Sequence, residues 1–338
     1  MANPFWNREQ RRARTLWRLV LQVLLFLVLQ VGLGMLLGLV GMLWVSAQPG
    51  GAAQLRSNPT AAITLLRGAP LFSLLSLLAI LGAMVLSVWL AGRFLDRRRF
   101  SDFGFHFSRS WWLDFGFGLG LGAVLMVIIF LVELAAGWVQ VTGTFVSTGF
   151  GFAPTIALAV AQFIAVGIQE ELFSRGYQLH NLAEGLNIKG LGARGAVLVA
   201  WVITSAIFAS LHLANPNASA VSTIFLVAAG LFLGLGFILT GELAIPIGIH
   251  ITWNFFQGNV FGFPVSGTPH GASFIATAQK GPVLVTGGAF GPEAGLMGLA
   301  AIVLGSFLTV LWVRRRQGQA TVCDRLAEYP VPAPAEPL

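Results

Sequence analysis

The sequence predicts an all-α polytopic membrane protein, a bundle of about eight transmembrane helices. Of its 338 residues, 56% are hydrophobic and only 10% are charged, whereas soluble domains are usually about a quarter charged. The mean hydropathy is +0.80, and several apolar runs have the length of roughly twenty residues that a helix needs to cross a bilayer. The backbone must satisfy its own hydrogen bonds in lipid, and the strand-like alternation of a membrane barrel is absent, so the spans are expected to be helices.

The apolar runs divide the chain into eight expected helices. They lie at 17–46, 71–92, 111–138, 155–180, 194–213, 219–240, 243–261 and 294–313. We expect a basic N-terminus at 1–16, three helices within 17–153, a core with an outer loop at 154–293, and a last helix within 294–316. The outer loop, 262–293, is either solvated or re-entrant. The tail at 317–338 ends in a Pro-rich stretch and is expected to be disordered.

The positions of Lys and Arg predict the orientation. Of the 20 basic residues, 17 fall in segments that this arrangement places on one side, and only Arg56, Arg67 and Lys280 fall on the other. Because Lys and Arg are retained in the cytoplasm, both termini are expected to be cytoplasmic. The net charge of +7 is thus accounted for by membrane anchoring, and no nucleic-acid partner is expected.

Charged residues near the end of the fourth expected helix form the first polar cluster. A charge within a span commonly costs about 2.5–3.5 kcal/mol, so such residues usually face the bundle interior and serve a function. In the stretch "VGIQEELFSRGY", Glu171 and Arg175 are four residues apart and can pair on one face of a helix. Glu170 lies about 100° away around the helix, so this pairing would leave its carboxylate available.

Two more clusters repeat the four-residue spacing. Phe208 and His212 share one face of the fifth helix, and His250 and Asn254 share one face of the seventh. Each cluster alone is compatible with an ion pair, a satisfied core histidine or an interhelical hydrogen bond. Taken together, a Glu, two His and an Asn on three helices can activate water and stabilise an oxyanion.

These residues resemble the motifs of the intramembrane CAAX-processing and bacteriocin-processing proteases, the CPBP or Abi family. That family has EExxxR, FxxxH and HxxxN on three transmembrane helices, in this order. Here they read Glu170-Glu171-Leu-Phe-Ser-Arg175, Phe208-Ala-Ser-Leu-His212 and His250-Ile-Thr-Trp-Asn254. The later stretches "FPVSG" and "TGGAFGPE" are similar to bacterial members, and the similarity covers about 155–293.

The resemblance implies an endopeptidase that hydrolyses peptide bonds in or beside the membrane, with a catalytic core in helices four to seven. Glu170 would be the general base, and His212 would help to hold the water. His250 and Asn254 would stabilise the oxyanion, while Glu171 and Arg175 would order the site. The family is commonly described as metalloproteases, and Glu170, His212 and His250 could bind zinc. The compact H-E-x-x-H spacing is absent, so a metal-free glutamate mechanism stays open beside the zinc one.

Two other function classes fit the same clusters: a transporter or proton and ion relay, and a non-catalytic membrane scaffold. The expected partners are the lipid bilayer and a protein or peptide substrate, prenylated or not. The Gly-rich, Arg-rich character and "TGGAFGPE" favour a bacterial cytoplasmic membrane. The expected helix ends place His212 roughly 10 Å or more toward the outer face from Glu170, which conflicts with a shared site.

Overall fold

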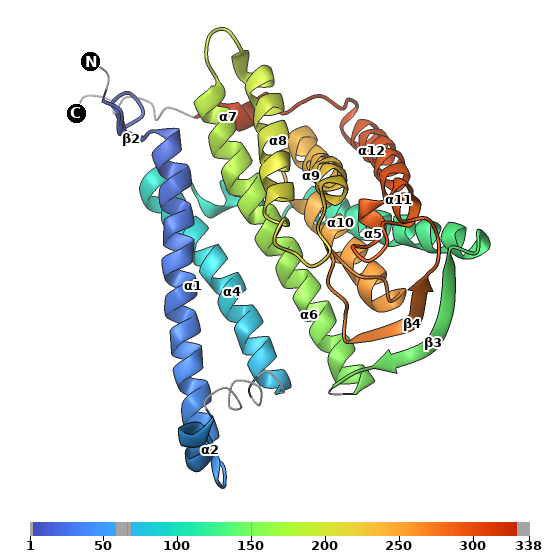
Figure 1. The fold of residues 1–338 in the computed structure, drawn as a ribbon. Helices are drawn as coiled ribbons and strands as arrows, with labels where there is room; N and C mark the ends of the chain where they lie inside the picture. The colour runs from blue at the N-terminus through green and yellow to red at the C-terminus, as the bar shows by residue number, and fades with distance from the viewer. Residues whose placement is uncertain (1–2, 59–65, 67–68, 150, 330–338) are drawn as a thin grey trace.

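The computed structural model describes residues 3–58, 66, 69–149 and 151–329. The expected outer-side Arg67 and the Pro-rich end at 330–338 lie outside these residues. The described chain is a helical bundle with a small two-stranded antiparallel ribbon at each end (Figure 1).

The long helices follow the apolar runs closely. They are α1 Thr15–Ser46, α4 Pro70–Ala91, α5 Arg109–Ala135, α6 Phe152–Glu171, α8 Gly192–Ser210, α9 Ala220–Thr240 and α12 Leu296–Gln317. The shorter α-helices are α2 Gly51–Ser57, α7 His180–Leu186, α10 Ala244–Phe255 and α11 Val283–Thr286. In the described part of the chain, seven helical segments are long and apolar enough to cross a membrane. The predicted all-α membrane fold is therefore confirmed.

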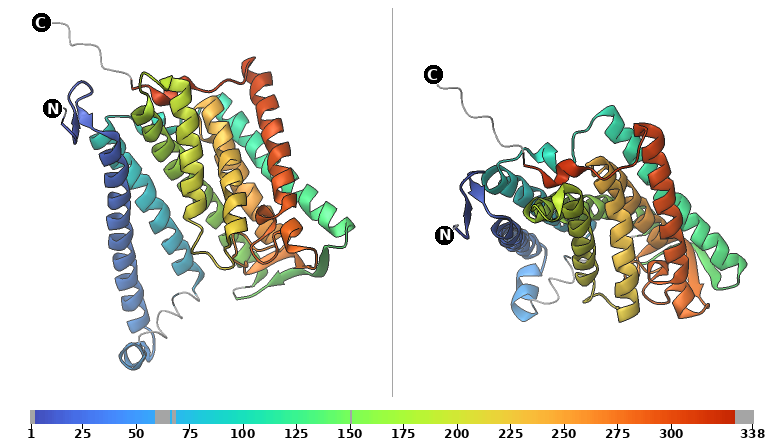
Figure 2. Two further views of the ribbon diagram at one scale, coloured as in Figure 1. Left: turned by 45° about the horizontal axis from the view of Figure 1, so that its top comes forward. Right: turned by 90° about the horizontal axis from the view of Figure 1, so that it is seen from above.

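Short turns of other geometry join these helices. The π-helical segments are η1 Gly92–Asp96, η3 Leu172–Leu179 and η4 Phe256–Val260. The 3₁₀ turns are η2 Phe100–Phe103, η5 Pro292–Ala294 and η6 Asp324–Ala327. The strands are β1 Trp6–Asn7, β2 Arg12–Ala13, β3 Val139–Ser147 and β4 Ala272–Gln279. Figure 2 shows α1 and α4 side by side at one flank of the bundle, away from α12.

The expected seventh span, 243–261, is a short inner helix. Helix α10 has 12 residues and continues into the five residues of η4, so it is not among the seven candidate spans. It packs against α5, α6 and α9 inside the bundle (Figure 1). Its direction is opposite to that of α9. The N-terminal strand β2 lies at the same end of the molecule as α7, against which η6 packs (Figure 1).

Glycines in α5 allow α10 to approach closely. A Cβ on Gly118 would lie 2.5 Å from the Ile245 carbonyl oxygen, and one on Gly122 would lie 2.6 Å from the Ile249 carbonyl oxygen. This is the small-xxx-small spacing that brings membrane helices into backbone contact. From the α10 side, a Cβ on Gly248 would lie 2.6 Å from the carbonyl oxygen of Phe115.

The expected fourth span, 155–180, is longer than predicted. Helices α6, η3 and α7 run on without a break from Phe152 to Leu186, 35 residues, whereas α8 has 19. At about 1.5 Å per residue these lengths are roughly 52 Å and 28 Å. Because α7 and α8 meet at one end of the bundle, α8 ends about halfway along the longer unit, near Glu170. The depth conflict between His212 and Glu170 is thereby removed.

The segment expected as an outer loop, 262–293, is largely folded. Strand β4 pairs antiparallel with β3, with a bulge between Val141 and Gly143, and the sequence did not predict this ribbon. Phe263, Val265 and Phe290 are buried within the segment. The ribbon lies at the opposite end of the bundle from β1–β2 (Figure 1).

The prediction of a disordered tail at 317–338 is wrong for the part that the structure describes. Leu326 and Ala327 of η6 are buried, and η6 packs against α7 and α8. The Asn187 side chain donates a hydrogen bond to the Ala327 carbonyl at 3.0 Å. The guanidinium of Arg12 lies 3.5 Å from the ring centroid of Tyr329. Apolar burial and this cation–π contact order the tail up to residue 329.

Candidate active site

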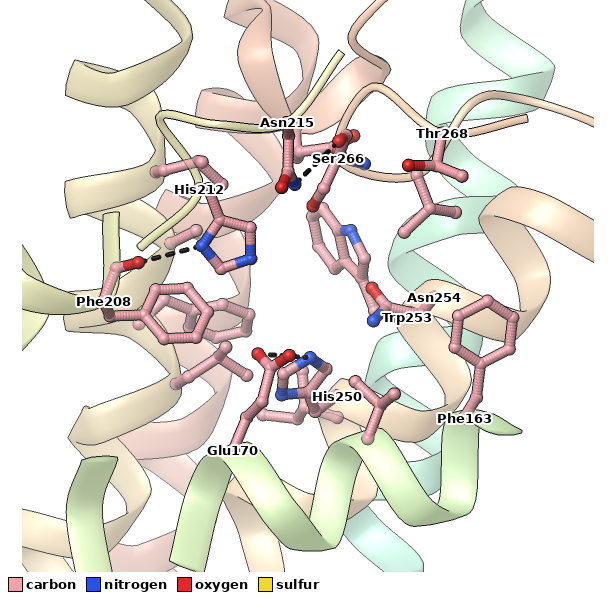
Figure 3. A pocket seen from close by; sticks show the side chains of 18 of the residues that line it. Phe163, Glu170, Phe208, His212, Asn215, His250, Trp253, Asn254, Ser266 and Thr268 are labelled. Carbon is pink, nitrogen blue, oxygen red and sulfur yellow. Dashed lines mark hydrogen bonds and ion pairs between the residues drawn. The ribbon is translucent and has the colours of Figure 1, made fainter. Parts of the chain in front are cut away.

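A cavity of about 210 Å³ lies inside the bundle where α6, α8 and α10 converge (Figure 3). Aromatic side chains from four helices, Phe163, Phe208, Phe232 and Trp253, form much of its wall. The polar lining residues are Gln162, Glu170, His212, Asn215, His250, Asn254, Ser266, Thr268, His270 and Glu293. The structure thus brings four of the six predicted site residues to one space, and the other two lie behind it.

Those two, Glu171 and Arg175, form the predicted ion pair. Arg175 Nη1 lies 3.0 Å from Glu171 Oε1, and the two side chains are 2% and 0% exposed. Arg175 Nη2 also donates to the Gly230 carbonyl on α9 at 2.9 Å, and its guanidinium lies 4.6 Å from the Phe208 ring centroid. The pair therefore ties the end of α6 to α8 and α9. It forms although the helix becomes π-helical at Leu172.

His250 contacts two carboxylates, that of the buried Glu171 and that of Glu170, which faces the cavity. Its Nδ1 lies 2.8 Å from Glu171 Oε1, and its Nε2 lies 3.8 Å from Glu170 Oε2. Because a carboxylate only accepts, Nδ1 carries the proton in the first contact. Glu171 is fully buried, whereas the Glu170 side chain is 30% exposed and reaches into the cavity (Figure 3). As expected from helical spacing, Glu171 pairs with Arg175, while the Glu170 carboxylate is left facing the cavity.

The orientation of His212 is fixed by its own helix turn. It follows α8, and its Nδ1 donates to the Phe208 carbonyl oxygen at 2.8 Å. A carbonyl cannot donate, so the proton sits on Nδ1 and Nε2 presents a lone pair. Figure 3 shows Glu170, His212, His250 and Asn254 around one open space. This space has a carboxylate, an imidazole acceptor and a carboxamide on its walls.

The arrangement does not make a ready metal site. In the part of the chain that the structure describes, no three His, Cys, Asp or Glu side chains are grouped to hold a metal ion. His212 and His250 each hold Nδ1 against a protein oxygen, which is also the usual arrangement of a metal-binding imidazole and leaves Nε2 of each ring toward the cavity. The possible zinc ligands Glu170, His212 and His250 are thus not grouped as a set in this structure, although the two rings have a suitable orientation.

Residues 264–270 form one wall of the cavity, which we call the roof. Glu293 holds this roof in place, a role that the sequence did not indicate. Its Oε1 accepts a hydrogen bond from the Ser266 backbone N–H at 2.6 Å, and Oε2 accepts one from the side chain of Gln257. Gln257 also donates to the Pro264 carbonyl at 2.6 Å. Burial raises the pKa of Glu293 to about 7. Ser266 and Glu293 belong to the stretches "FPVSG" and "TGGAFGPE". No local sequence pattern indicates that these two stretches are joined by a hydrogen bond.

Two further residues, in or beside the roof, had no assigned role. His270 contacts the Phe163 ring, with 5.1 Å between the ring centroids, and burial lowers its pKa to about 4. Asn215, in the turn after α8, donates to the Ser266 carbonyl at 3.0 Å. The roof is therefore connected by hydrogen bonds both to the His212 turn and to Glu293.

One protein-family model matches the segment that contains most of these residues. Residues 152–256 match the model of a protein family described as "Type II CAAX prenyl endopeptidase Rce1-like". No curated protein and no solved structure shows significant similarity to the chain. The matched segment runs from the start of α6 to the end of α10 and contains all six site residues predicted from the sequence. The segment that supplies most of the cavity lining is therefore similar to the Rce1-like family of CAAX endopeptidases.

Proposed function

We propose that this chain is an intramembrane endopeptidase, which hydrolyses a peptide bond of a protein or peptide substrate in or beside the bilayer. The observation that carries this proposal is the meeting of Glu170, His212, His250 and Asn254 around one interior cavity of the Rce1-like segment. Carboxylate, imidazole and carboxamide are the groups that amide hydrolysis by activated water requires.

In the first step, water lies between the Glu170 carboxylate and the Nε2 lone pair of His212. Glu170 removes a proton as the water oxygen forms a bond to the carbonyl carbon, and the carbonyl oxygen becomes an oxyanion. In the second step, the protonated Glu170 returns its proton to the leaving nitrogen, and the C–N bond breaks. The products are a free carboxyl group and a free amine, so every atom and proton of the water is accounted for.

Asn254 and His250 supply the hydrogen bonds to the oxyanion. The Asn254 carboxamide donates through its NH₂ group. His250 already donates Nδ1–H to Glu171, so it can donate a hydrogen bond to the oxyanion only when Nε2 also carries a proton. The resulting imidazolium is stabilised by carboxylates at both ring nitrogens. Glu171, held by Arg175, is thus a positioning residue rather than a reacting one.

The orientation is also proposed. Arg12, Arg18 and Arg98 converge on Glu184 at the end of the bundle where both ends of the described chain lie. Because basic residues favour the cytoplasmic side, we place this end in the cytoplasm and the β3–β4 ribbon on the outer side.

The decisive test compares membranes containing active protein with membranes containing Glu170→Gln, using mass spectrometry of new substrate N-termini. The variant keeps the side-chain size and removes the base, so cleavage should fall by about 10²-fold or more. Glu242→Gln is the matched control, because that carboxylate pairs with His106 away from the cavity. Equal cleavage by wild type and Glu170→Gln would refute the proposal.

A second arm tests the chemistry. Purified wild-type protein is assayed with and without a chelator, and its metal content is measured beside that of His250→Ala. We expect activity to survive chelation and both proteins to hold the same amount of metal. Stoichiometric zinc that is lost together with activity would replace the carboxylate mechanism by a metal-dependent one.

A further inference from the structure

A second, larger cavity opens at the end of α4. Its lining residues lie between Trp89 and Asp102, and none of them lines the proposed active site. It has a volume of about 1100 Å³. The arginines Arg93, Arg97, Arg98 and Arg99 line it. Asp102 is the one acidic residue of the lining. The cavity is therefore strongly positive.

Three of the four arginines have no carboxylate partner. Arg98 is committed to Glu184 and to the backbone carbonyl of Glu328. Arg93, Arg97 and Arg99 are exposed, and among the described residues they form no ion pair.

The carboxylate of Asp102 does not neutralise this charge. It caps the short turn η2, where it accepts a hydrogen bond from the Arg99 backbone N–H at 3.0 Å and lies 3.4 Å from the Ser101 hydroxyl. It forms no ion pair with a guanidinium in the described structure. About three positive charges thus surround the cavity, and no carboxylate among the described residues pairs with them.

The position of the cavity indicates which kind of anion balances the charges of Arg93, Arg97 and Arg99. It lies where the candidate span Pro70–Asp96 ends. Two aromatic side chains line it on the span side: Trp89 is 47% exposed and Phe94 is 68% exposed. Exposed aromatic residues at the end of a span mark the headgroup level of the bilayer. The free guanidinium groups therefore lie at the depth of lipid phosphates.

We propose that this cavity binds the headgroup of an anionic phospholipid, with its phosphate among Arg93, Arg97 and Arg99 and its acyl chains beside Trp89 and Phe94. Guanidinium groups bind phosphate through paired, charge-assisted hydrogen bonds. A zwitterionic lipid would add its own cation to an uncompensated positive site, so the charge balance favours a net negative headgroup. The exposed aromatic side chains favour a lipid over a free phosphate ion.

The test measures lipid binding by the full chain in mild detergent, with native mass spectrometry during titration of phosphatidylglycerol and, separately, phosphatidylcholine. We expect wild type to prefer phosphatidylglycerol. In the variant Arg93→Gln/Arg97→Gln/Arg99→Gln this binding should weaken by about tenfold or more, while phosphatidylcholine binding stays unchanged. Each single Arg→Gln variant should lose a smaller part, which keeps the test valid if the triple variant does not fold.

The matched control separates this cavity from general membrane anchoring. Arg8→Gln/Arg314→Gln/Arg315→Gln removes three exposed positive charges from the same end of the molecule but outside the cavity. Its affinity for phosphatidylglycerol should stay within about threefold of wild type. An equal loss in the two triple variants would overturn the proposal. So would equal binding of both lipids, or displacement of the lipid by millimolar inorganic phosphate.

Discussion

Replacing Glu171 by Gln should destabilise the protein more than any other conservative change in the candidate site. Gln has the same shape but no charge. Glu171 Oε1 receives hydrogen bonds from Arg175 at 3.0 Å and from His250 at 2.8 Å, and none of the three side chains is more than 7% exposed. The substitution leaves the Arg175 guanidinium buried without a carboxylate in contact.

The magnitude follows from that burial. Removing one partner of a buried ion pair costs about 3–5 kcal/mol. The Gln oxygen still accepts hydrogen bonds, and Arg175 keeps its contacts with the Gly230 carbonyl and the Phe208 ring, so the lower end applies. At about 2–4 °C per kcal/mol, the scale for chains of 150–250 residues, about 3 kcal/mol corresponds to at most roughly 6–12 °C in apparent Tm for this longer chain of 338 residues.

The assay is thermal unfolding in detergent, with all variants scanned at one rate because unfolding of such proteins is often irreversible. Glu171→Leu/Arg175→Met is the matched control, since it removes both charges and leaves none unpaired. It should be less destabilised than the sum of its two single variants. An apparent Tm for Glu171→Gln within about 2 °C of wild type, or strict additivity in the cycle, would show that the pair does not hold the site together.

Three further predictions concern the oxyanion site, the roof and the orientation. Asn254→Ala should lower kcat by about 10²–10³ with unchanged thermal stability, measured with a cleaved peptide; an unaltered kcat would remove Asn254 from the oxyanion site. Because the pKa of Glu293 is raised to about 7, folded protein binds more protons than unfolded protein between about pH 4.5 and 7, so stability falls as pH rises through this window. Glu293→Gln should flatten that part of the apparent Tm profile, and an identical slope in both proteins would contradict the assignment. Cysteines at Arg97 and Arg315 should react with a membrane-impermeant reagent only from the cytoplasmic side, and one at the exposed Pro269 only from outside; labelling of position 269 from the cytoplasm alone would reverse the topology.

Local spacing was enough to predict contacts between residues four positions apart, including His212 in the turn after α8. Glu171 and Arg175 pair as their four-residue separation indicates, and Phe208 packs beside His212 with 4.9 Å between ring centroids. Such contacts depend on helical periodicity alone, and they form even though the fourth span continues through a π-helical segment.

Contacts between distant segments could not be predicted in this way. The Ser266 N–H and the Glu293 carboxylate are 27 residues apart, and no periodic pattern relates them. An apolar run also cannot distinguish a buried helix from a span, which is why α10 was expected to be longer. The depth of His212 depended on the true end of α7 at Leu186, which hydropathy placed six residues too early.

The two walls of the cavity are held by different kinds of contact. The α10 wall rests on α5 through the backbone at Gly118 and Gly122, where even a methyl group would collide with a carbonyl oxygen. The roof at Ser266 is held by a few hydrogen bonds to Glu293 and Asn215. Packed backbones move little, whereas individual hydrogen bonds exchange readily with water. We therefore expect an entering polypeptide to displace the roof and to find His250 and Asn254 already in place.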